Sequence, residues 1–348
     1  MPIPTFLTRF ATCIALAISF SSSTLLCASE AKIPDFVGDW SGKFSNPKAG
    51  YYKKSDRLVA RVVGKGDDLY EIQFLEEFDK RVRPYLVANA RSKGNKLILD
   101  TDGWKASFDN GICSGTGTPE DSEVMEFALK KVQRVSPTLG LKAPAGAIVL
   151  FDGSNLGEWK RSSETDATWK IQKNGDLVCA PPSSNDRQRN NLYTKQEFEA
   201  CRLHLEFKTP YEPQNRFQHR ANSGVFFQNE YEVQILDSYG NSGSWDDCGA
   251  LYKVAPPRVN ASYPPGEWQT LDIEYYPADF DLGGKLSSPP RISVSLNGVV
   301  VQKDQPITSP TAHVWTGRQV EPANVSGSIW IQDHGHQLTF RNIWVKEM

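Results

Sequence analysis

The chain has 348 residues, of which 39% are hydrophobic and 11% aromatic, and its formal net charge is -2 at pH 7. This composition is sufficient for packed cores, and the length fits two domains better than one. The near-neutral charge excludes the basic footprint of a nucleic-acid-binding protein, so we expect no nucleic-acid partner.

Residues 1–31 have the pattern of a targeting segment. Arg9 is the only early charge, and residues 10–28 are apolar or small. This predicts a secretory signal peptide cleaved after Ala28 or Ala31. No later run approaches the roughly 20 apolar residues of a membrane helix. We therefore expect an exported protein (periplasmic, cell-surface or extracellular) without a membrane span.

Two of the six cysteines fall in the predicted signal peptide. The other four are Cys113, Cys179, Cys201 and Cys248. In an oxidising compartment they permit two disulfides, with three possible connectivities. Cys179 and Cys201 lie in adjacent predicted strands and are the favoured pair. A metal site on these residues is not expected, since the chain has no C-x-x-C.

Residues 32–134 consist of short alternating runs separated by Gly-, Asp- and Asn-containing breaks. Strands are predicted at 58–63, 69–74, 84–90, 96–99, 104–108 and 124–132. Short strands at about ten-residue spacing indicate a small all-β meander or barrel. No catalytic pattern is present in this unit, and its role stays open.

Residues 135–146 contain two prolines and two glycines, which is the composition of a linker. Residues 147–348 then form a second unit without sustained helical periodicity. Strands are predicted at 147–151, 169–172, 177–180, 191–193, 201–208, 222–228, 231–237, 269–276, 291–296, 299–302, 328–332 and 337–346. This number is too large for an immunoglobulin-type sandwich and indicates an all-β jelly-roll sandwich.

Two of these strands carry polar side chains on one face. Glu232 and Gln234 alternate with Val233 and Ile235, and side chains on a strand point to opposite faces. Later in the chain the alternation places Trp330, Gln332 and His334 together, opposite Ile329 and Ile331. If the aliphatic residues are core, both polar sets lie on an open face, with Trp330 as a platform for sugar stacking.

His204 alternates with core residues on another predicted strand. Its neighbours Arg202 and Glu206 share its face, opposite Leu203 and Leu205. We interpret His204 as an exposed strand histidine.

Several short motifs occur in order along the second unit. They are FDGSNLGEW at 151–159, NSG at 222–224, YEVQILD at 231–237, GALY at 249–252, PGEW at 265–268, NG at 297–298, QDHG at 332–335 and FRNI at 340–343. Together they resemble the 3-keto-disaccharide hydrolase family over about residues 147–348. The resemblance implies a concanavalin A-like sandwich and cleavage of 3-keto-glycosides.

The resemblance implies a particular chemistry for a carbohydrate substrate. The 3-keto group acidifies the C2 proton, so a base removes it, the group on C1 leaves, and water adds afterwards. Glu232 suits the base and His334 the acid. Gln234, Gln332 and Arg341 suit hydrogen bonding to hydroxyls or to the enolate oxygen. Asn222 is expected to line the site.

The sequence is less informative about cofactors and metals than about the catalytic side chains. No cofactor is required by this chemistry, and a divalent cation is an open possibility. His334 and His336 have an alternate spacing that metal sites use, although Gly335 between them indicates a turn and further ligands would be needed.

A second interpretation comes from E-x-Q-x-x-D at 232–237, which is similar to the E-x-D-x-x-E strand of laminarinase-type retaining glucanases. A straight strand places Glu232 and Asp237 on opposite faces, roughly 17 Å apart. A retaining pair needs carboxyls about 5 to 5.5 Å apart. A bulge would return Asp237 to the face of Glu232, and Asp237 is kept as a substrate-binding candidate. The non-enzymatic alternatives are a lectin-like carbohydrate-binding protein and a cell-surface or envelope interaction protein, because fold does not determine function.

Overall fold

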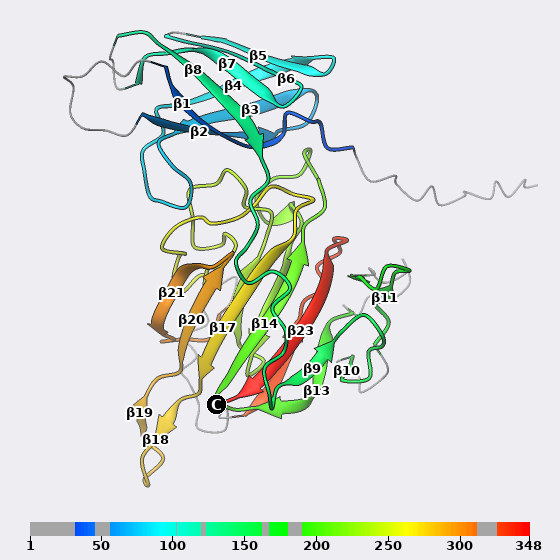
Figure 1. Ribbon diagram of the computed structural model, residues 1–348. Helices are drawn as coiled ribbons and strands as arrows, with labels where there is room; N and C mark the ends of the chain where they lie inside the picture. Colours follow the sequence, from blue (N-terminus) through cyan, green and yellow to red (C-terminus); the bar gives the residue numbers. More distant parts are fainter. Residues whose placement is uncertain are drawn as a thin grey trace, which may run out of the picture. The chain divides into compact units, whose positions relative to one another are not determined.

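The computed structural model describes residues 32–45, 56–101, 103–119, 123–161, 167–179, 190–311 and 326–348 (Figure 1). The predicted signal peptide lies outside these ranges. The secondary structure is almost wholly β, as the sequence predicts. Across the described ranges, no helix has the length and apolarity needed to cross a membrane.

The first unit is a closed antiparallel barrel in which each strand pairs with the next and the last pairs with the first. Its interior is filled by aromatic side chains, among them Phe74 and Trp104, whose rings stack with centroids 4.7 Å apart. This confirms the barrel form of the expected meander or barrel. The strands are β1 (Gly38–Phe44), β2 (Arg57–Gly64), β3 (Leu69–Leu75), β4 (Leu86–Lys93), β5 (Lys96–Thr101), β6 (Trp104–Asp109), β7 (Ile112–Gly117) and β8 (Met125–Val132).

The second unit is a sandwich of two antiparallel sheets, confirming the predicted fold class. The five-stranded sheet has the order β10 (Trp159–Lys160), β13 (Leu192–Phe198), β22 (Gly327–Ile331), β15 (Ser223–Phe227), β16 (Tyr231–Ile235). The eight-stranded sheet has the order β11 (Lys170–Ile171), β12 (Leu177–Val178), β23 (Thr339–Glu347), β14 (Cys201–Lys208), β17 (Gln269–Tyr276), β20 (Arg291–Leu296), β21 (Val299–Pro306), and β9 (Ile148–Phe151) pairs with β23. A small hairpin joins β18 (Asp279–Phe280) to β19 (Leu286–Ser288).

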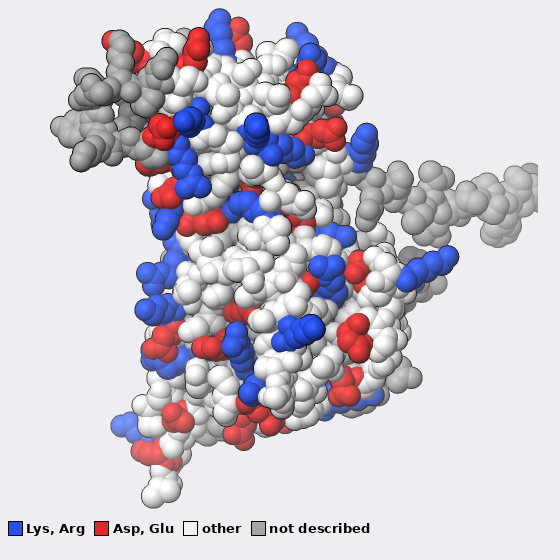
Figure 2. All heavy atoms as spheres, in the orientation of Figure 1, with Lys and Arg blue, Asp and Glu red and all other residues white. Residues whose placement is uncertain are grey.

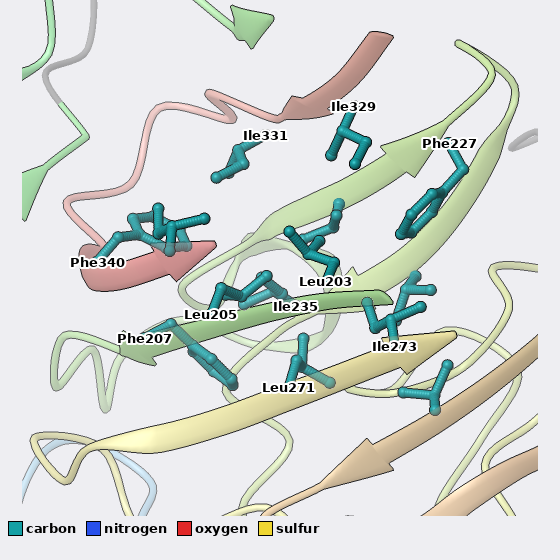
Figure 3. Packing of buried hydrophobic residues seen from close by; sticks show 14 of the residues in the cluster. Leu203, Leu205, Phe207, Phe227, Ile235, Leu271, Ile273, Ile329, Ile331 and Phe340 are labelled. Atoms are coloured by element: carbon teal, nitrogen blue, oxygen red, sulfur yellow. The ribbon is translucent and has the colours of Figure 1, made fainter. Parts of the chain in front are cut away.

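The core of the sandwich lies between the inner faces of the two sheets. In Figure 3, Leu203 and Leu205 of β14 point toward the same interior as Ile329 and Ile331 of β22. All four side chains are at most 1% exposed. Because alternate residues must then face outward, the outer face of β22 is fixed by this packing.

The connecting strap (residues 135–146) is bound to the outer face of the eight-stranded sheet. Hydroxyls of Ser136 and Thr138 bond the Thr270 hydroxyl of β17 at 2.6 and 2.8 Å. The Leu141 carbonyl accepts hydrogen bonds from Asn342 and Trp344 of β23. A segment with linker composition is therefore held by side chains of the sheet.

The strap explains why the expectation for His204 is wrong. His204 does point outward from β14, but it is fully buried and its Nδ1 lies 2.8 Å from the Asp272 carboxylate. Burial by itself lowers the pKa of His204, and the hydrogen bonds to Asp272 and Glu206 outweigh it, so the pKa is raised. Alternation along β14 predicted the correct face for His204, but it could not predict that the strap covers this face.

The favoured disulfide between Cys179 and Cys201 is also wrong. The main chain of Cys179 bonds Leu338 just before β23, whereas Cys201 pairs with Glu347 at the far end of that strand. Nine residues at about 3.3 Å each separate these positions by roughly 30 Å. Four buried cysteines are present as free thiols: Cys113, Cys179, Cys201 and Cys248.

Candidate functional site

Glu232 and Trp330 lie in one row across the outer face of the five-stranded sheet. Glu232 of β16 is paired with Phe226 of β15, which is paired with Trp330 of β22. In the neighbouring row Gln234 is paired with Gly224, whose carbonyl accepts the Gln332 amide. The structure therefore brings Glu232, Gln234 and Trp330 onto one face, with β15 between β16 and β22, whereas Gln332 and His334 follow the end of β22.

The Glu232 side chain is folded across Gly224. A Cβ placed on Gly224 would lie 2.4 Å from Glu232 Oε1, closer than any real contact of this kind. Residue 224 of β15 must therefore be glycine for the Glu232 carboxylate to keep this position. Glu232 is only 7% exposed, and its amide donates to the Thr311 hydroxyl at 2.9 Å.

Gln218 joins Asn222 to Gln234. Gln218 lies on a 3-10 turn, η2 (Phe217–His219). Its side-chain oxygen accepts from the amide nitrogens of Asn222 at 3.1 Å and Gln234 at 2.9 Å, and its own amide donates to the Asp246 carbonyl. Asn222 Oδ1 and Gln234 Oε1 are buried and have no hydrogen-bond partner in the described structure. Both oxygens therefore keep unused capacity to accept hydrogen bonds.

A carboxylate–histidine pair lies at the Asn222 end of this face. His336 Nδ1 is 3.1 and 2.9 Å from the two oxygens of Glu212, which also accepts the amide of Ala221, the residue before Asn222. The rings of His334 and His336 are nearly parallel, 14° apart, with centroids separated by 6.0 Å. The predicted residue His334 is therefore accompanied by a second imidazole.

Asp237 is committed to an internal ion pair. Its carboxylate accepts from Arg220 Nε at 2.7 Å and from the Tyr239 amide at 3.2 Å, and it is 3% exposed. Burial raises the pKa of Asp237, and the Arg220 charge opposes that effect. Asp237 therefore supports the loop after β16 and is not placed as a second catalytic carboxylate or as a substrate ligand.

Trp330 does not offer the ring face that a stacking platform needs. Phe226 covers one side, nearly parallel at 9° and with centroids 3.6 Å apart, and Tyr193 of β13 lies on the other side at 5.3 Å. Cross-strand neighbours in one row stand side by side, so large aromatic rings there stack on each other. What Trp330 does offer is its indole N–H, a buried donor with no partner in the described structure.

Arg341 belongs to the other sheet. It lies on β23, where Nε donates to Glu206 at 2.7 Å and the guanidinium lies 3.9 Å over the Trp268 ring. Burial opposes ionisation of Glu206, but hydrogen bonds from His204, Asn342 and Arg341 outweigh it and lower its pKa to about 2. Arg341 is therefore not assembled with Glu232.

The described residues also bear on a possible cation. Within these ranges no group of three or more His, Cys, Asp or Glu side chains converges as a metal site requires. The acceptors of the face are mainly amide oxygens, a donor set suited to hydroxyls, and we assign no metal to it.

Residues 146–346 match the family described as the 3-keto-alpha-glucoside-1,2-lyase-like domain. The chain belongs to this family. The match covers the sandwich, as the resemblance over 147–348 implied, and leaves the barrel outside the family domain.

Solved structures similar to this chain include two proposed glycosyl hydrolases from Parabacteroides distasonis. One is 35% identical, with a TM-score of 0.53, covering 60% of this chain and 86% of that chain. The other is 18% identical, with a TM-score of 0.44, covering 58% of this chain and 94% of that chain. No curated protein matches the chain.

Three residues of the candidate site were not singled out from the sequence. Glu212 and Gln218 lie in a polar loop without periodicity, and only the structure shows that they reach the sheet. For His336 the alternate spacing with His334 was a signal, but it pointed to metal binding, whereas the ring bonds a carboxylate.

Proposed function

We propose that the sandwich cleaves the glycosidic bond of 3-keto-glycosides by elimination followed by hydration. The family and its neighbours support a glycosyl hydrolase-type protein. The observation that carries the finer proposal is the placement of Glu232 across Gly224, on the same face as two unpartnered amide oxygens. A poised carboxylate beside hydroxyl acceptors is what proton abstraction from a bound sugar requires.

In this proposal Glu232 removes the C2 proton of the keto sugar. The C1–C2 double bond forms as the C1–O bond breaks, and His334 gives its proton to the leaving oxygen. The 3-keto oxygen carries the developing negative charge and needs a donor, for which the Trp330 indole N–H and the side-chain amide of Gln332 are the candidates. Asn222 Oδ1 and Gln234 Oε1 accept from sugar hydroxyls.

The glucanase-like alternative requires a second carboxylate within reach of Glu232. Asp237 is the residue that the motif would supply, and it is buried against Arg220. The keto-sugar chemistry needs only one carboxylate, so the structure favours it over a retaining mechanism.

The test compares a chromogenic 3-keto-glucoside with its unoxidised parent, using wild-type protein and Glu232→Gln. We expect release from the keto form alone, reduced about 10²- to 10⁴-fold in the variant, the range for loss of a general base. Release from both substrates would favour the glucanase-like function. Binding without release would leave a lectin-like protein.

Export is a further part of the proposal and rests on residues 1–31. We propose that the protein acts outside the cytoplasm after removal of this segment. Mass spectrometry of the mature protein from its host should show an N-terminus after Ala28 or Ala31; an intact Met1 would contradict export by this route.

A further inference from the structure

Glu212 fixes the proton on one nitrogen of His336. The carboxylate faces Nδ1 with both oxygens, and the ring sits in a site where its side chain is 13% exposed. A carboxylate on Nδ1 selects the tautomer with its hydrogen there and leaves Nε2 with a lone pair. His336 is therefore oriented as a base, with Glu212 ready to stabilise the imidazolium that forms.

The charge state of Glu212 fits this role. Burial raises the pKa of its carboxyl, but hydrogen bonds from His336, Asn215 and the Ala221 amide outweigh burial and lower the pKa below its usual value. The other charged groups around the pair are Arg220 and Asp237, which neutralise each other, and the neighbouring His334 ring. An anionic carboxylate thus faces His336 at neutral pH.

The pair is joined to the proposed substrate face on two sides. Glu212 bonds the amide of Ala221, directly before Asn222. The His336 ring is nearly parallel to that of His334, which lies with Gln332 in the loop after β22 (Gly327–Ile331). A base at this end can act on the substrate without being part of the Glu232 row.

We propose that His336, positioned by Glu212, activates the water that adds to C1 in the second half of the reaction. This rests on the proposed function. His336 Nε2 takes one proton from water, the oxygen bonds C1, and the electron pair of the C1–C2 double bond moves toward the 3-keto oxygen. Glu232 returns the proton it removed to C2, which restores the ketone. His336 then releases its proton to solvent, and His334 takes one proton from solvent to replace the one that it gave to the leaving group.

The experiment follows the two half-reactions separately in Glu212→Gln and His336→Gln. The substrate is a chromogenic 3-keto-glucoside; aglycone release reports elimination, and absorbance of the conjugated unsaturated ketone reports the hydration that consumes it. Glu212→Gln keeps an oxygen for Ala221 and Asn215 while losing the charge. His219→Gln, an exposed histidine of the same loop, is the control.

We expect both variants to release aglycone within about threefold of the wild-type rate while hydration falls about 10²-fold or more, so that the unsaturated ketone accumulates. Equal slowing of both steps, with unchanged thermal melting, would make the pair structural and overturn the inference. So would unchanged hydration. If wild-type protein releases no aglycone, the proposed function itself fails, and this assignment fails with it.

Discussion

Gly224→Ala tests whether the position of Glu232 matters for catalysis. The added Cβ would lie 2.4 Å from Glu232 Oε1, whereas ordinary contact begins at 3.4 Å, so the carboxylate must move by about 1 Å. A displacement of about 1 Å in a reacting group can cost about 10²-fold in rate. We therefore expect kcat on a 3-keto-glucoside to fall about 10²-fold.

The substitution should leave the fold intact. Gly224 does not have positive φ, so alanine can adopt its conformation. Alanine in a strand is favoured over glycine by about 0.5–1 kcal/mol, which offsets part of the contact. Melting temperature and circular dichroism, measured beside the kinetics, separate a displaced carboxylate from an unfolded domain.

Gly327→Ala is the matched control in the same sheet. Its Cβ would lie 2.6 Å from Gln228 Oε1 and 3.0 Å from Gln228 Cα, a clash with a residue that has no proposed part in the reaction. We expect lower stability with kcat retained. Full activity in Gly224→Ala, or equal losses in the two variants, would refute the argument from Glu232 placement.

Three further predictions concern stability and reactivity. Burial, with a smaller contribution from Asp39, raises the pKa of Glu267 to about 7. The folded protein therefore binds this proton more tightly than the unfolded chain does. The free energy of unfolding should fall by about 1–2 kcal/mol, after allowance for solvent screening, as pH rises from about 4.5 to 7. Urea unfolding at several pH values should show a smaller pH dependence of the unfolding free energy in Glu267→Gln than in wild type. An equal pH dependence would contradict this prediction. Arg220→Met leaves the Asp237 carboxylate buried without its partner and should destabilise the protein by about 3–5 kcal/mol; a wild-type urea midpoint would show the pair to be dispensable. A thiol reagent should label none of the four described cysteines in native protein and all four in denaturant, and rapid native labelling would contradict their burial.

Alternation along strands was sufficient to predict which side chains point away from the core of the sandwich. The period of two placed Glu232, Gln234 and Trp330 on the outer side, and the aliphatic residues between them fixed which side was inner. Strand order was not available from this pattern, and so Arg341 was grouped with residues of a different sheet. The same lack of strand order made Cys179 and Cys201 look like neighbours.

Contacts made by loops were the other source of error. His204 was given the correct face, but the strap that buries it lies about sixty residues earlier in the chain. Glu212 reaches His336 across 124 residues of sequence. Such contacts depend on where a loop crosses the face of a sheet, and the alternation of residues along one strand does not predict them.

The strap also means that the folding unit and the family domain do not begin at the same residue. The family match starts at residue 146. A fragment cut there would lose the Gly140 amide that bonds Glu206 and the Thr138 hydroxyl that bonds Asp272, and would open His204 to water. The sandwich of this protein thus depends on a piece of chain outside its family's boundary, and a shortened version that folds alone should begin no later than Ser136.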